Sequence, residues 1–435
     1  MLDVCLEDLV CAGILAFFAM QGAIPFIAPN QALESTRSAA SSLTLYGGIL
    51  FQIIVDIGII IFLLHNAHRV ARWLGAMQWT AAVAIYAVMS AAWSQFPLLT
   101  LRRSLPFALA GLFGVHLAVR FPVHRQLSIL RVAMVTLALA SIVLAVCFPK
   151  LGLDASAGHH QNWQGVFTQK NACGRAMVLA TTIVLADCRI SLSRFISLLL
   201  FLFVLFMSGS RSAWAAEGVI LVFFAWSAVA RRIDNHSRIA LGLATVCLAI
   251  VLMSVVWYLL PALLTVVGRD ITLSGRTEIW KQVWRFIEQR PVLGWGYAAF
   301  WRGIDGQSFK IAVALRFVVF HAHNGFLELW LELGLPGLAF FALSYLRAWQ
   351  KLWPVLRTGD MRRGIWMALL LVLVFLYSLD ENTLLTFNGL FWVLYVSAVA
   401  NIELLSSEDR LRAMIRRVID SSSFERMWDK PEWLR

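Results

Sequence analysis

Long apolar runs alternate with short polar segments along most of this 435-residue chain. As a helix, a run of about 20 apolar residues crosses a hydrocarbon core of about 30 Å. Twelve runs approach that length, so the pattern predicts an all-α, polytopic membrane protein with about 12 transmembrane helices. The predicted spans are 9–29, 43–64, 73–93, 104–121, 128–148, 171–188, 192–209, 212–230, 239–261, 324–346, 364–380 and 384–401.

The basic residues of the loops are distributed unevenly between the two sides of the predicted bundle. Fourteen Lys and Arg residues lie on the side that also holds both termini, and six lie in the short loops of the opposite side. Cytoplasmic loops carry the excess of Lys and Arg, so both termini are predicted in the cytoplasm. We therefore treat residues 1–401 as one transmembrane domain and residues 402–435 as a cytoplasmic tail.

Two loops on the outer side are long, at 149–170 and 262–322. The second contains GRTEIWKQVWRFIEQRP, in which Ile279, Val283 and Ile287 recur at helical spacing before Pro291. This spacing predicts an amphipathic helix in the periplasmic loop. The sequence leaves two placements open for this helix, namely in the membrane interface or packed on the helical bundle.

The composition agrees with a membrane protein, since 60% of the residues are hydrophobic and only 14% are charged, whereas soluble domains average about 25% charged residues. The net charge of +12 follows the loop pattern and indicates topology, not a nucleic-acid partner. The six cysteines have no CxxC or Cys/His ligand spacing, which argues against a disulfide framework or a zinc motif. The outer loops contain no Asp-x-Asp and no nucleotide-binding Gly-rich loop, so we expect neither a metal nor a cofactor.

Arg211 and Arg276 are basic residues on the outer side whose sequence context is unusual. Arg211 lies in MSGSRSAW, in a turn so short that its guanidinium stays near the membrane boundary, and Arg276 lies in LSGRTEIW. Each follows Gly or Ser residues, which let the backbone approach a ligand closely. A guanidinium recognises phosphate bidentately and stays charged. The two residues are therefore suited to an anionic, membrane-anchored group.

His323 precedes the tenth predicted span, and Asn324 is a good N-cap for that helix. A His at a water-accessible membrane boundary can act as a general base on a sugar hydroxyl or hold it by a hydrogen bond. The alternative is a structural His that binds a neighbouring carbonyl. His321 lies two residues earlier and would point elsewhere on a helix, so we rank it lower.

Glu328 and Glu332 lie on one face of the tenth predicted span, four residues apart. They could pair with Arg211, line a cavity or hold the bundle together. Lys170 and Asn171 end the first long outer loop, where a Lys is either a phosphate contact or an anchor that snorkels to the interface. Structural roles are expected for the other acidic residues within or at the ends of spans, Glu217, Asp380 and Glu381.

Four stretches together resemble the O-antigen ligase and Wzy-type polymerase superfamily of bacterial envelope glycan synthesis. They are AAWSQFPLLTLRRSL, SGSRSAW, SGRTEIW and FHAHNGFLELWLELGLPG, and their order covers most of the chain. The run WQGVFTQKNACG is more similar to the exopolysaccharide polymerases of that superfamily, of the succinoglycan-polymerase kind, than to the ligases.

The resemblance implies a GT-C-like, inverting, metal-independent glycosyltransferase of the bacterial inner membrane. Its donor would be a polyprenyl-pyrophosphate-linked oligosaccharide at the periplasmic face. By motif, Arg211 and Arg276 would neutralise the pyrophosphate leaving group, and His323 would position or deprotonate the acceptor hydroxyl. The substrate-binding candidates are Lys170, Asn171, Asn324, Glu328 and Arg102.

The resemblance leaves the acceptor open. A polymerase would transfer to a growing glycan, whereas a ligase would use the same donor with lipid A core as the acceptor. Membrane lipid and a chain-length regulator are further candidate partners. A lipid-linked glycan flippase or a secondary transporter is the alternative of another class. The lack of a detectable repeat between the two halves and the long outer loop argue against it.

Overall fold

A computed structural model describes residues 5–21, 42–154, 162–187, 191–230, 275–357 and 361–421. These residues form helices and no strand, and a single isolated bridge joins Leu153 to Trp163. The all-α prediction is confirmed. The helices are α1 (Leu6–Ala19), α2 (Ser42–His65), α3 (Ala67–Ala76), α4 (Gln78–Met89), α5 (Pro97–Arg120), α6 (Val123–Cys147), α7 (Pro149–Gly152), α8 (Lys170–Ala186), α9 (Leu192–Ser208), α10 (Arg211–Ala230), α12 (Arg276–Gln289), α13 (Ser308–Leu315), α14 (Gly325–Arg357), α15 (Met361–Asp380) and α16 (Leu390–Ser421).

Six helices of the described residues are long and apolar enough to cross a membrane, or seven if a bent pair, Ala67–Ala76 and Gln78–Ala92, forms one span. Two further apolar helices, Leu192–Ser208 and Gly364–Asp380, are shorter. The chain is therefore a multi-pass membrane protein, while the count of 12 stays a prediction. The predicted span 239–261 lies outside the described residues, as do 262–274 of the long loop.

Two helix starts differ from the predicted spans. Helix α5 begins at Pro97, because proline is pre-organised for the first helical position, so Arg102 and Arg103 lie within its first turns and not in a loop. Helix α16 begins only at Leu390, because residues 381–389, which follow the end of α15, form a loop. At its other end α16 continues as a helix to Ser421, beyond the predicted domain limit at 401.

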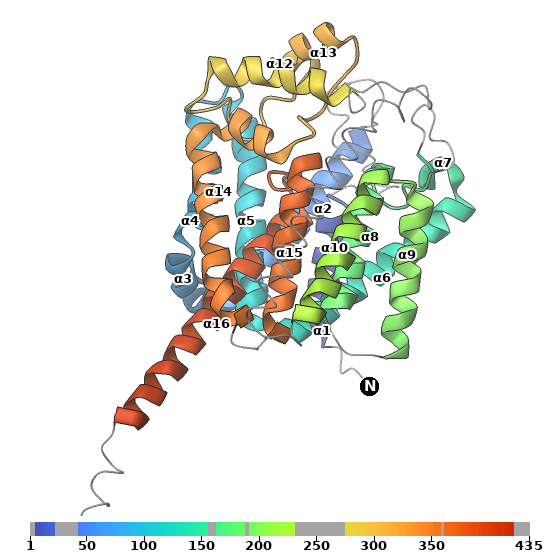
Figure 1. Cartoon of the computed structure of the whole chain (residues 1–435). Helices are drawn as coiled ribbons and strands as arrows, with labels where there is room; N and C mark the ends of the chain where they lie inside the picture. The colour runs from blue at the N-terminus through green and yellow to red at the C-terminus, as the bar shows by residue number, and fades with distance from the viewer. Residues whose placement is uncertain are drawn as a thin grey trace, which may run out of the picture.

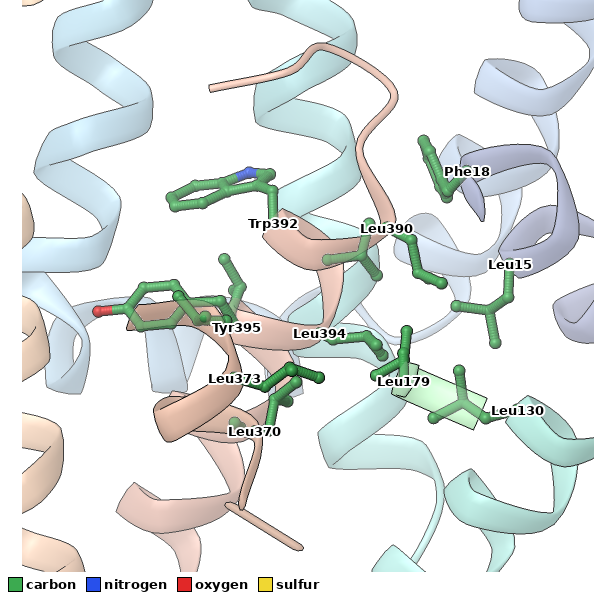
Figure 2. Packing of buried hydrophobic residues seen from close by; sticks show 14 of the residues in the cluster. Leu15, Phe18, Leu130, Leu179, Leu370, Leu373, Leu390, Trp392, Leu394 and Tyr395 are labelled. Atoms are coloured by element: carbon green, nitrogen blue, oxygen red, sulfur yellow. The ribbon is translucent and has the colours of Figure 1, made fainter. Parts of the chain in front are cut away.

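The helices pack around one apolar core. Figure 2 shows Leu15 and Phe18 of α1, Leu130 of α6 and Leu179 of α8 close to Leu390 and Leu394 of α16. Buried leucines of α15 complete this region, so the N-terminal helix and the C-terminal helix share a core although they are far apart in sequence. This packing fixes α8, α15 and α16 relative to one another, and the site described below lies at their ends.

Helix α14 is broken at Gly334, which has φ 65° and ψ −168°. The break frees backbone groups, and the preceding segment satisfies them: Trp295 N–H donates to Leu331 O at 3.0 Å and Gly296 N–H to Glu332 O at 2.9 Å. Leu335 N–H in turn donates to Pro291 O at 3.0 Å. Such pairing is what makes a broken helix tolerable at membrane depth. Gly and Pro are the residues that most often interrupt a helix, so the Gly-Leu-Pro-Gly run in the sequence predicts a break here, and the break at its first glycine confirms that prediction.

We expect Gly334→Ala to destabilise the protein by about 3 kcal/mol, because both the backbone conformation and the space require glycine. An added Cβ would lie 1.9 Å from Val292 O. Thermal unfolding in detergent measures the effect. The matched control is Gly218→Ala, on a helix where a Cβ meets nothing within 4 Å; equal unfolding temperatures for the two variants would contradict this account of the break.

Helices α12 and α13 form a layer across one end of the bundle, whereas the C-terminal part of α16 extends from the opposite end (Figure 1). The layer has its own core, in which Ile279, Val283 and Ile287 of α12 are buried. The amphipathic helix is confirmed, and its apolar face packs on protein. Of the two placements left open by the sequence, packing on the bundle therefore holds for this face.

Candidate functional site

Four basic side chains contact one buried carboxylate, Glu381, which follows the last residue of α15. The shortest distances to its oxygens are 3.2 Å from Arg175 Nη1 and 3.4 Å from His323 Nδ1. His321 Nε2 lies at 3.6 Å and Arg276 Nη2 at 3.7 Å. Helices α8, α12 and α15 and the segment before α14 thus meet at one point. We call these five residues, together with Asp380, the Glu381 cluster.

The charges of the cluster balance one another. Burial alone would raise the pKa of Glu381, but Arg175 and the contacts with His323 and His321 outweigh it, so the pKa is held below its usual range. Glu381 is therefore ionised at neutral pH. Arg276 also pairs with Asp380. Two guanidinium groups are thus held at the surface end of the bundle by two carboxylates.

The two histidines lie side by side because the chain is not helical there. Their ring centroids are 4.0 Å apart, and His323 has a φ of 49°. The prediction that His321 points elsewhere is wrong, because α14 begins only at Gly325. Asn324 acts as its N-cap, as predicted: its Oδ1 accepts from Phe326 N–H and Leu327 N–H, each at 3.0 Å.

One hydrogen bond fixes the protonation of His321. His323 N–H donates to His321 Nδ1 at 3.2 Å, so this nitrogen is unprotonated and Nε2 faces Glu381 as the donor. Burial lowers the pKa of His321 to about 3, against the opposing effect of Glu381. A neutral His321 therefore braces His323 and adds no charge to the cluster.

Arg276 is the first residue of α12 and follows Gly275, which has a φ of 85°. The left-handed glycine turns the chain into the helix and directs Arg276 at the end of α15. Trp280, one turn later, donates from Nε1 to Ala322 O at 3.0 Å. Helix α12 is thereby tied to the histidine segment, so Arg276 and His323 are placed by the same contact.

Arg211 is exposed at the start of α10 and lies in a neighbouring group of residues, beside the start of α8. Ser210 Oγ donates to Asn171 Oδ1 at 3.0 Å, and Lys170 N–H donates to Asp154 Oδ2 at 3.2 Å. Among the described residues Arg211 has no ion-pair partner. Asn171 connects this group to the Glu381 cluster, because Arg175 follows it by one turn of α8.

Glu328 and Glu332 accept hydrogen bonds from other parts of the protein. Both oxygens of Glu328 are occupied by protein donors, Trp301 Nε1 at 2.6 Å and Ala322 N–H at 2.7 Å. Glu332 accepts from Ala298 N–H at 2.9 Å. The two glutamates hold residues 298–322 on α14 by internal hydrogen bonds, which is one of the roles that the sequence left open, and neither pairs with Arg211 among the described residues. Arg102 is exposed on α5.

Sequence reasoning missed Arg175 and gave Asp380 and Glu381 only structural roles. Arg175 lies in an apolar run, where an arginine is energetically costly and marks a functional candidate. This signal can be seen in the sequence alone. The convergence of Glu381 with residues of α8, α12 and the segment before α14 had no signal in a single sequence, because those residues lie up to about two hundred positions away from it along the chain.

The cluster also contains the donor set of a transition-metal site. His321, His323 and Glu381 each offer one ligand atom, and these atoms lie within 4.8 Å of one another. Imidazole and carboxylate suit zinc. Arg175 and Arg276 already neutralise the carboxylate, so a divalent cation would bind against two adjacent positive charges.

Comparison with known proteins covers part of the site: Arg276, His321 and His323 lie in a segment that matches a family model, whereas Arg175, Asp380 and Glu381 lie outside it. Residues 196–342 match the model of the O-antigen ligase family, and this segment contains Arg211, Arg276 and His323. The chain is 35% identical over 86 residues to the exopolysaccharide production protein ExoQ of Rhizobium meliloti (strain 1021). That alignment spans 19% of this chain and 19% of the relative.

Proposed function

We propose that this protein, whose resemblance to the O-antigen ligase and Wzy-type polymerase superfamily is confirmed, is a glycosyltransferase of the bacterial inner membrane. It would join polyprenyl-pyrophosphate-linked repeat units into an exopolysaccharide or O-antigen at the periplasmic face. One observation carries the proposal: Arg276 and His323, both in the matched segment, converge on Glu381 at the end of the bundle where α12 lies.

The donor would bind through guanidinium groups. A pyrophosphate would take the place of the carboxylates that now hold Arg276, since phosphate and carboxylate share the bidentate geometry. Arg211 stands exposed at the first residue of α10, where backbone N–H groups add positive potential. Preorganised positive charge of this kind stabilises a departing pyrophosphate without a metal.

The acceptor would bind at His323. With Nδ1 towards Glu381 at 3.4 Å, the other ring nitrogen is left for the sugar hydroxyl. The hydroxyl oxygen would attack the anomeric carbon from the face opposite the leaving group. A glycosidic C–O bond forms, the C–O bond to pyrophosphate breaks, and the hydroxyl proton passes to His323. Polyprenyl pyrophosphate leaves and the configuration inverts.

A second candidate, ligation to lipid A core, is favoured by the description of the matched family, whereas the ExoQ similarity favours polymerisation. Purified protein in lipid vesicles would be given the lipid-linked oligosaccharide alone or with lipid A core. A ladder of repeat units from the donor alone establishes a polymerase. Transfer only after lipid A core is added establishes a ligase, and the absence of transfer under both conditions overturns the proposal.

We expect transfer to continue in EDTA at a rate within about twofold of the untreated rate, because the guanidinium groups supply the charge that a metal would otherwise provide. The measurement is the initial rate of transfer after dialysis against the chelator. A lost activity that Zn²⁺ restores would contradict the expectation and would assign the His321, His323 and Glu381 group to a metal.

A further inference from the structure

Behind the Glu381 cluster lies a small pocket between the ends of α1 and α8 and the segment that leads into α16. Its cavity volume is about 30 Å³, and its walls are mainly apolar, with Phe18, Leu179 and Phe391 among them. Gln21, Arg175 and Thr383 are the polar exceptions, and Arg175 is the charged one. The pocket therefore combines an apolar lining with one guanidinium, which is the combination that suits the junction between a lipid tail and its phosphate.

Polar groups around this pocket are buried without hydrogen-bond partners. Arg175 is only 5% exposed, and its Nη1 has the ion pair with Glu381 but no hydrogen bond. Buried polar atoms without partners are rare in native proteins, so a concentration of them indicates a missing ligand. Seven such atoms of the described residues lie on Arg175 and on residues between 377 and 388: Arg175 Nη1, Tyr377 OH, Asp380 Oδ2, Glu381 Oε1, Asn382 Oδ1, Thr383 Oγ1 and Asn388 Oδ1. Of these residues Arg175 and Thr383 line the pocket. Four of the seven atoms are acceptor oxygens, so the atoms that can donate to an anion are Arg175 Nη1 and the hydroxyls of Tyr377 and Thr383.

Three of these groups can donate to an anion and lie near one another. Arg175 and Thr383 line the same pocket. Tyr377 lies one helical turn before Glu381, the partner of Arg175, and its carbonyl oxygen accepts from Glu381 N–H at 2.8 Å. A guanidinium with two hydroxyl donors is a set that binds phosphate oxygens. The apolar walls continue from the same point, so the phosphate that fits here is one attached to a lipid.

We propose that Arg175, with the hydroxyls of Tyr377 and Thr383, binds the phosphate group next to the lipid of the polyprenyl-pyrophosphate donor. This inference rests on the proposed function and adds a third guanidinium to the two near the cluster surface. Arg276 and Arg211 would act on the sugar side of the pyrophosphate, where the bond breaks. Arg175 would bind the lipid side and determine that the donor is a lipid phosphate.

The test uses full-length protein in lipid vesicles and polyprenyl monophosphate as a competitor of the donor. The variants are Arg175→Gln, Arg175→Lys and Tyr377→Phe, of which the last removes only a hydroxyl. The control is Arg131→Gln, which changes an arginine of α6 that donates to Ser193 Oγ at 3.2 Å and lines neither the pocket nor the Glu381 cluster. We expect Arg175→Gln to weaken the competitor and to raise the donor KM by about tenfold or more, with a smaller rise for Tyr377→Phe.

The kinetic effects distinguish two roles of Arg175, namely binding of the donor lipid phosphate and positioning of Glu381. A fall in kcat with unchanged donor KM and unchanged competition would overturn the proposal, because Arg175 would then only position Glu381. Unchanged constants in every variant would overturn it as well. If Arg175→Gln does not fold, the lysine and phenylalanine variants decide. Direct binding of polyprenyl monophosphate, measured without acceptor, tests the inference even if wild-type protein transfers no glycan, a result that would refute only the proposed function.

Discussion

Arg276→Ala lowers kcat/KM for glycan transfer by about 10²–10³-fold, the loss that follows removal of one preorganised donor to a developing negative charge. The variant removes the guanidinium that pairs with Asp380 and Glu381. Two carboxylates are then left facing an incoming pyrophosphate, so repulsion adds to the lost attraction. The measurement is the initial rate of transfer in proteoliposomes, at donor concentrations below KM.

Two further variants make this result specific. Arg276→Lys keeps the charge but loses the bidentate geometry, and we expect an intermediate rate. Arg285→Ala is the matched control on the same helix, since Arg285 is exposed and, among the residues that the structure describes, its hydrogen bond is to Gln282 Oε1 at 3.3 Å. Its rate should equal that of the wild type. An active Arg276→Ala variant, or an equal loss in Arg285→Ala, would remove Arg276 from the account.

His323→Ala lowers kcat by about 10²–10⁴-fold, the range for loss of a general base. The loss should appear in kcat more than in the donor KM, because the role proposed for His323 is on the acceptor hydroxyl. His323→Gln can form a hydrogen bond but cannot act as a base. It therefore distinguishes positioning of the acceptor hydroxyl from removal of its proton. Recovery of most of the rate in His323→Gln assigns positioning, and no recovery assigns proton transfer.

A histidine away from the site serves as control for that series. His68 is exposed on α3, and His68→Ala should leave kcat unchanged. His321→Ala should lower kcat less than His323→Ala does, because His321 is neutral and only holds His323 through its backbone N–H. If His321→Ala lowers kcat more than His323→Ala does, then His321 acts on the acceptor hydroxyl and His323 only supports it.

The fold class and two residues of the Glu381 cluster were accessible from the sequence for simple physical reasons. Apolar runs near 20 residues encode membrane helices, so the bundle, the break at Gly334 and the amphipathic α12 could be predicted. Arg276 and His323 stood out because charged and titratable groups at the outer membrane boundary need a reason to be there. The structure then brought these two residues to one carboxylate.

The remainder of the site depends on packing that local patterns do not encode. Glu381 looked like an ordinary helix-end acid, since nothing near it in sequence reveals that α8 delivers Arg175 to it. His321 was ranked low because the helix was extended back past its cap at Asn324. The predicted span begins at residue 104 and so leaves Arg102 outside it, whereas α5 begins at Pro97. Each error concerns where a helix begins or which helices meet.

The central claim is that this chain moves a glycan from a lipid pyrophosphate by means of the Glu381 cluster. Its most direct test is the release of polyprenyl pyrophosphate from a labelled lipid-linked oligosaccharide by the purified protein in vesicles, with acceptor present. We predict one polyprenyl pyrophosphate for each glycosidic bond formed, and a rate below about 1% of this in Arg276→Ala. No release by the wild-type protein with either acceptor, or undiminished release by the variant, would contradict the account.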